Sequence, residues 1–105
     1  MFIKVAVDGR VTLEDQANFR AFKLVVEAGP ADLAATRRAL KDVADLPDAA
    51  TAWVFEAALR RAPEVARDET WQQGLAAMIE KARPHGWIDD ARKAIKAHVE
   101  WTRPA

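Results

Sequence analysis

The stretch WQQGLAAMIEKA, residues 71–82, has the clearest periodicity in the chain. Its apolar residues recur every three or four positions, which places them on one face of a helix. They are Trp71, Leu75, Met78, Ile79 and Ala82. Asp68 can cap the first turn, and Pro84 and Gly86 follow the last one. The stretch therefore predicts an amphipathic helix with a buried apolar face.

Apolar residues also have helical spacing in the segments before and after this helix. We expect further helices over residues 30–44, 49–62 and 88–101, separated by breaks at Pro47, Pro63 and Pro84. Alanine is abundant in all three segments, and it has the highest intrinsic helix propensity. The loops between them are short, so neighbouring helices should pack roughly antiparallel.

The N-terminal residues follow a different period. Ile3, Val5 and Val7 alternate with Lys4 and Ala6, which predicts a strand, and Asp8-Gly9 predicts a turn.

Two continuations compete after this turn. In the first, a three-residue loop places Val7 opposite Val11 and Val5 opposite Leu13 in a hairpin. In the second, which we favour, Thr12 caps a helix that ends at Gly29-Pro30. Residues 22–26 would also suit a strand, because they are mostly apolar and end in two valines.

These elements predict a mostly α fold, a compact bundle of about five helices with a short N-terminal β-strand or hairpin. The class becomes α+β if Phe19–Glu27 is a strand. We expect one helical domain over residues 1–105. The first strand needs a partner for its backbone groups, and this partner is Arg10–Glu14, Phe19–Glu27 or the same strand of a second copy. The last choice predicts a homodimer.

The amino-acid composition excludes several classes of function. Sixteen basic residues balance sixteen acidic ones, so the basic excess of a duplex-binding protein is missing and we expect no nucleic-acid partner. Cysteine, serine and tyrosine are absent, which removes thiol and serine nucleophiles and a tyrosine acid. No leader pattern or membrane-length apolar run occurs. We therefore expect a cytoplasmic protein with no membrane partner.

The histidines and tryptophans are the candidate site residues. His85 and His98 could bind a metal or transfer protons, but no third ligand stands at helical spacing from them, so we expect no metal and no cofactor. Of the four tryptophans, Trp71 fits the helix stripe and should be core. Trp53 and Trp101 lie off their stripes, and Trp87 lies at a loop–helix junction, so these three are candidate binding residues.

Two functions follow. The first is a non-catalytic protein-interaction or oligomerisation module that forms a homodimer or binds another protein. The alternative is a small-molecule-binding protein or an enzyme, with a site near His85, Trp87, His98 and Trp101.

Overall fold

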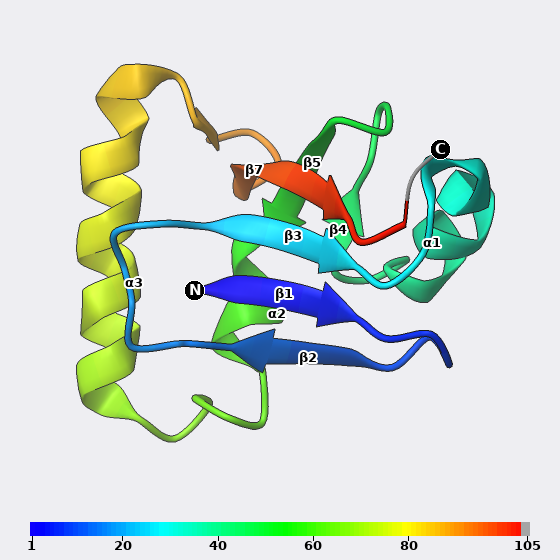
Figure 1. Cartoon of the computed structure of the whole chain (residues 1–105). Helices are drawn as coiled ribbons and strands as arrows, with labels where there is room; N and C mark the ends of the chain where they lie inside the picture. The colour runs from blue at the N-terminus through cyan, green and yellow to red at the C-terminus, as the bar shows by residue number, and fades with distance from the viewer. Residues whose placement is uncertain (104–105) are drawn as a thin grey trace.

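A curled, mixed sheet of seven strands organises the chain in the computed structural model, which describes residues 1–103 (Figure 1). The strands are β1 Phe2–Val5, β2 Val11–Glu14, β3 Lys23–Val26, β4 Ala44–Asp45, β5 Thr51–Phe55, β6 Ile88–Asp89 and β7 Ala94–Trp101. Their order is β2-β1-β3-β7-β5-β4, and β6 also pairs with β7. β1, β3 and β7 are parallel, and the remaining pairs are antiparallel.

Three helices accompany the sheet. They are α1 Leu33–Ala39, α2 Glu56–Arg60 and α3 Glu69–Ala82, and short 3-10 turns span Pro30–Asp32 and Arg83–His85. α3 lies across the starting ends of β1 and β3, and α1 lies beyond their opposite ends (Figure 1). Within residues 1–103, no helix combines the length and the apolar character needed to cross a membrane.

The prediction of a mostly helical five-helix bundle is wrong. Helices make up 31% of the chain and strands 28%. The helix predicted over residues 71–82 is confirmed as α3, and Asp68 caps it, because its side chain accepts a hydrogen bond from Trp71 N at 3.0 Å. Its predicted apolar face is buried at Trp71, Leu75, Ile79 and Ala82.

The helix predicted over residues 88–101 is instead β6, a turn and β7. Ile95 and Val99 are four positions apart, a spacing that fits both a helix face and a strand face. The burial of the residues between them alternates: Ala97 is buried, whereas Lys96 and His98 are exposed. This alternation is that of a strand with one covered face.

The predictions for residues 30–44 and 49–62 also overestimated the length of the helices. In the first segment the α-helix covers only Leu33–Ala39, and Ala44 already belongs to β4. In the second, Thr51–Phe55 is strand β5 and only Glu56–Arg60 is α-helix. β-Branched and aromatic residues in the β5 segment favour a strand, and pairing with β7 outweighs the helix propensity of the alanines.

The N-terminal hairpin forms, and the favoured helix over residues 12–28 does not. Val5 pairs with Val11 and Ile3 with Leu13, a register two residues from the one we predicted. The turn closes earlier, with Gly9 N donating to Ala6 O at 2.9 Å and Gly9 at a φ of 87°, which leaves Val7 outside the strand. The strand alternative near residues 22–26 is correct and corresponds to β3.

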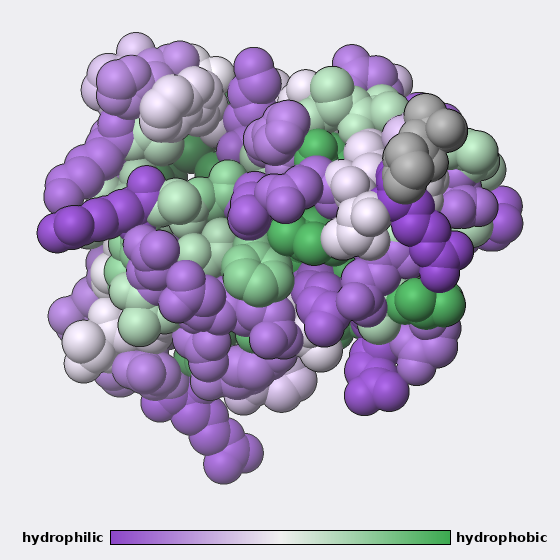
Figure 2. Space-filling view, viewed as in Figure 1, coloured by the Kyte–Doolittle hydropathy of each residue, from purple (hydrophilic) through white to green (hydrophobic). Residues whose placement is uncertain are grey.

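The core lies on one face of the sheet. Ile3, Leu24, Val54, Ile95 and Val99 point inward and pack with the helices in one buried cluster. The opposite face carries the alternate side chains and is open to solvent. In the space-filling view, apolar residues gather around β3 on this open face, within a hydrophilic surround (Figure 2).

Candidate functional site

One edge of β7 is shared by two strands that meet from opposite directions. β6 pairs with Ala94 and Ile95, and β3 pairs with residues 98–101. Trp87, just before β6, lies opposite Lys96, whose backbone N–H donates to Trp87 O at 2.8 Å. Continuing the β3 register by one residue places Phe22 opposite Ala97. The two segments therefore diverge from the same point on β7, which opens a space between them.

A cavity of about 750 Å³ fills this space. Its walls come from the β2–β3 loop, α3 and its C-terminal turn, Trp87, the start of β5 and the middle of β7. The lining residues are Phe19, Arg20, Ala21, Phe22, Ala50, Thr51, Met78, Lys81, Ala82, His85, Trp87, Ile95, Lys96, Ala97 and His98. The surface is hollowed beside the end of α3, with apolar residues at the bottom (Figure 2).

Trp87 is the most exposed aromatic side chain of the cavity, at 47%. One face of its indole stacks on His85, with ring centroids 4.4 Å apart and planes 19° apart. Gly86 joins the two residues at a φ of 79°, a left-handed conformation that glycine adopts without strain. This reversal at the end of α3 turns Trp87 back against His85.

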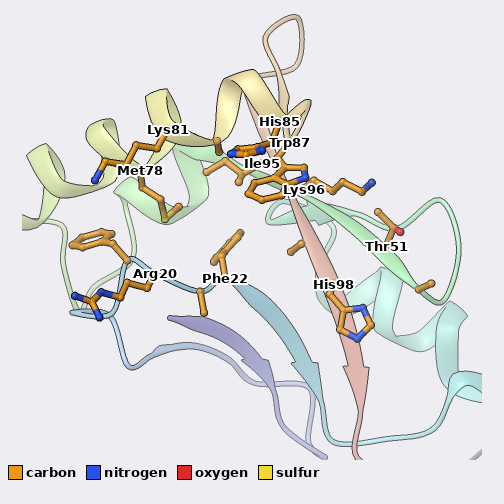
Figure 3. Close-up of a pocket in the computed structure, with 15 residues that line it drawn as sticks. Arg20, Phe22, Thr51, Met78, Lys81, His85, Trp87, Ile95, Lys96 and His98 are labelled. Atoms are coloured by element: carbon orange, nitrogen blue, oxygen red, sulfur yellow. The ribbon is translucent and has the colours of Figure 1, made fainter.

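The β2–β3 loop forms the facing wall and is held at Asn18, Phe19 and Ala21. The Met1 ammonium donates to Asn18 O at 2.9 Å and to Ala21 O at 3.1 Å. Phe19 packs against Trp71, with ring centroids 5.8 Å apart, and lies directly over Gly74 of α3. These contacts hold Arg20 and Phe22 at the cavity (Figure 3).

The charged residues of the lining are all basic. Arg20, Lys81 and Lys96 line the cavity with the two histidines, and no aspartate or glutamate is among the described lining residues. Their side chains form no ion pair or hydrogen bond with other residues in the 1–103 range. Arg20, Lys81 and Lys96 thus border one concave site without a carboxylate in direct contact among residues 1–103.

Neighbouring arginines outside the cavity behave differently. Arg83 pairs with Glu80 and Asp90, and the hydrogen bond that its guanidinium donates to Glu80 is the main reason that its pKa is raised. Arg92 pairs with Asp89 and Asp45, and its side-chain hydrogen bond lowers the pKa of Asp89. Acidic partners thus satisfy these surface arginines, in contrast to the cations of the cavity.

Three of the five candidate site residues line the cavity, namely His85, Trp87 and His98. His85 lies against Trp87 near the end of α3, and His98 projects from β7 (Figure 3). Trp53 lies outside the lining, with the Arg92 guanidinium 5.7 Å from its ring centroid. Trp101 is also outside, and its Nε1 donates to Ala49 O at 2.8 Å.

Most of the lining residues were not predicted from the sequence as site residues. Phe19–Phe22 and Lys96 were assigned to helices, and their convergence depends on the strand pairing around β7. Met78 and Lys81 lie on the correctly predicted α3, but nothing in its periodicity indicated a cavity there. A signal was present in the chain: Arg20 and Lys96 have no acidic residue within three positions.

The described lining offers few of the groups that catalysis commonly uses. It contains two imidazoles and the Thr51 hydroxyl, but no carboxylate to orient an imidazole as a general base. Among residues 1–103, no three His, Asp or Glu side chains converge as a metal site.

The homodimer prediction relied partly on an unpaired first strand, beside the off-stripe tryptophans and a Trp53 helix covered on two faces. β1 is paired on both sides, with β2 and β3, so the argument from this strand no longer applies. Homodimer formation stays a prediction from the sequence.

Comparison with protein-family models, curated proteins and solved structures found no match to this chain.

Proposed function

We propose that this protein binds a small organic anion in the cavity between α3, the β2–β3 loop and β7. The observation that carries the proposal is the clustering of Arg20, Lys81, Lys96 and both histidines around a cavity with no acidic residue in its described lining. The whole chain has a net charge of zero, so this local excess of positive charge is not part of an overall basic character.

The size and composition of the cavity support this function. Small-molecule sites commonly enclose about 300–1,000 Å³ and combine an apolar lining with a few polar groups. Here Phe22, Met78 and Ile95 provide apolar surface, and the basic side chains provide the polar groups. Removing an anion from water is unfavourable unless protein cations compensate, and unpaired cations compensate best.

The cations also act from opposite walls. Lys81 extends from α3 and Arg20 from the β2–β3 loop, whereas Lys96 belongs to β7 (Figure 3). The cavity is therefore bordered by cations on more than one wall. The proposal includes a cytoplasmic location, for which the cysteine-free composition is the support.

A thermal-shift screen with organic anions, organic cations and neutral compounds of similar size tests the proposal. We expect only anions to raise the melting temperature, because a ligand that binds the folded state stabilises it by mass action. An anion at about 100 times its Kd would add about 2.7 kcal/mol. A screen in which neutral or cationic compounds are equally effective, or in which no compound is, contradicts the proposal.

A charge-removing variant with a matched control locates the site. Lys96→Gln combined with Lys81→Gln should weaken binding of the anion found in the screen by at least about tenfold. Lys41→Gln removes an exposed lysine outside the cavity and should leave binding unchanged. If the double variant and Lys41→Gln changed the affinity for the anion equally, the anion would bind outside the cavity.

A further inference from the structure

The cavity has an aromatic side chain on each side of its entrance at β7. Trp87 and Phe22 come from the two segments that diverge from the β7 edge, and both rings point into the cavity (Figure 3). Phe22 is half-buried, and Trp87 is 47% exposed. One face of the Trp87 indole is covered by His85, so its other face is available for a ligand.

We infer that the anion bound in this cavity is aromatic, and that its planar ring stacks on the free face of Trp87 on the side toward Phe22. This inference rests on the proposed function. A flat ring in this position would complete a three-layer stack of His85, Trp87 and ligand, and stacked aromatic pairs are favoured beyond the apolar area that they bury.

The position of Lys96 determines where the anionic group of the ligand lies. Lys96 is adjacent to Trp87, because its backbone N–H donates to Trp87 O at 2.8 Å. His98 is two residues further along β7 and projects from the same face of the strand. A ring stacked on Trp87 therefore lies on the face of the sheet that carries Lys96 and His98, and we expect its carboxylate to be attracted by these two side chains.

An aliphatic acid could also bind to Lys96, but a rigid aromatic carboxylate fits Lys96 and Trp87 together better. The indole and the imidazole are held by stacking and by the turn at Gly86, so little side-chain entropy is lost when a flat ring binds. A flexible chain would lose its own rotational freedom without gaining a stacked contact.

Three probes with one skeleton separate the contributions of ring and charge. Naphthalene-2-carboxylate has both features, naphthalene-2-methanol keeps the ring without the charge, and decahydronaphthalene-2-carboxylate keeps the charge without the aromatic ring. Binding of each to the full chain is measured by titration in ¹⁵N–¹H correlation spectra. We expect the aromatic acid to bind at least about tenfold more tightly than either analogue and to shift the indole N–H signal of Trp87.

The outcomes distinguish the inference from the proposed function. Equal binding of the saturated and aromatic acids would overturn the aromatic inference and leave an anion site. Equal binding of the alcohol and the aromatic acid would overturn both. Failure of the aromatic acid to bind, while an aliphatic anion from the screen does bind, would overturn the inference alone. Failure of every anion would overturn both.

Two variants with matched controls assign the contacts. Trp87→Leu should weaken naphthalene-2-carboxylate about tenfold and leave the saturated acid nearly unchanged, whereas Trp53→Leu, outside the lining, should affect neither probe. Lys96→Gln should weaken both acids and not the alcohol, with Lys41→Gln as its control. Because Trp87 and Lys96 are exposed, both variants should fold, and the unchanged spectra of buried residues verify this. Full affinity of Trp87→Leu for the aromatic acid would contradict the stacking geometry.

Discussion

Gly74 shows how one residue couples a helix to the wall of the cavity. It lies within α3 directly beneath Phe19, and a Cβ added to it would be 2.6 Å from Phe19 Cε2 and 2.7 Å from Phe19 Cζ. Glycine in a helix interior is unfavourable by about 1 kcal/mol relative to alanine. Here the missing side chain lets the Phe19 ring pack on the helix and against Trp71.

Gly74→Ala should therefore be destabilising in the natural chain and stabilising when Phe19 is absent. We expect the single variant to lower the free energy of unfolding by about 1 kcal/mol, because overpacking of about 1–3 kcal/mol exceeds the gain in helix propensity. In a Phe19→Ala background, the same change should raise it by about 1 kcal/mol. Urea unfolding of the four proteins measures both effects. A stabilising effect of alanine with Phe19 present would show that the ring moves aside at no cost.

At the scale of elements, the edge strand β2 is protected by a side chain from a distant segment. Glu64, between α2 and α3, accepts a hydrogen bond from Leu13 N at 2.9 Å through Oε2. Exposed backbone groups on an edge strand are a template for pairing with another chain, and a charged group placed on the edge opposes it.

Glu64→Ala should expose this edge and promote self-association. We expect light scattering to show a mean mass that rises with concentration more steeply than for the natural chain. Glu64→Gln is the control, since it retains an oxygen acceptor for Leu13 N–H and should behave more like the natural protein. Identical behaviour of alanine and glutamine variants would show that the Glu64 contact does not protect the edge.

Arg92, in the turn between β6 and β7, links two strands, β4 and β6. Its guanidinium is 2.7 Å from an Asp45 oxygen in β4 and 2.7 Å from an Asp89 oxygen in β6, just before β7. The Arg92 side-chain hydrogen bond is the main cause of the lowered pKa of Asp89.

This lowered pKa predicts a stability loss in acid. A carboxyl whose pKa is lower in the folded state stabilises the fold above its ordinary value of 3.8. The contribution disappears as the pH falls through the lowered folded-state value. Asp89→Asn should therefore make the free energy of unfolding less dependent on pH in this acid range, as measured by urea unfolding at a series of pH values. The effect should be small, since the pair is solvent-exposed. A steeper dependence in the variant would contradict the assignment.

For the whole molecule, the sheet has a covered face and an open face, and the cavity opens where two segments diverge along β7. We predicted that two copies of the chain form a homodimer. Size-exclusion chromatography with light scattering should then give twice the chain mass of 11.6 kDa. A mass of one chain at all concentrations would contradict the homodimer, and binding of anions by such a monomer would show that the cavity functions without a partner copy.

The sequence by itself determined those elements whose structural signals lie within their own residues. The helix around residues 71–82 has a cap, a long regular period and a terminating signal, so it could be predicted without tertiary information. The Asp8-Gly9 turn was predicted correctly, but the hairpin was only the alternative to a favoured helix, and its predicted register was wrong. His85, Trp87 and His98 were recognisable as unusual residue types.

Tertiary structure decided the rest, because the deciding interactions join residues far apart in the chain. Ile95 and Val99 fit a helix and a strand equally well, and β7 becomes a strand because β5 and β3 pair with its two edges. The cavity depends on the same pairing, which brings Phe22 and Trp87 to adjacent positions on β7. Periodicity describes one element at a time, so it could identify single residues of the site but not their convergence around one cavity.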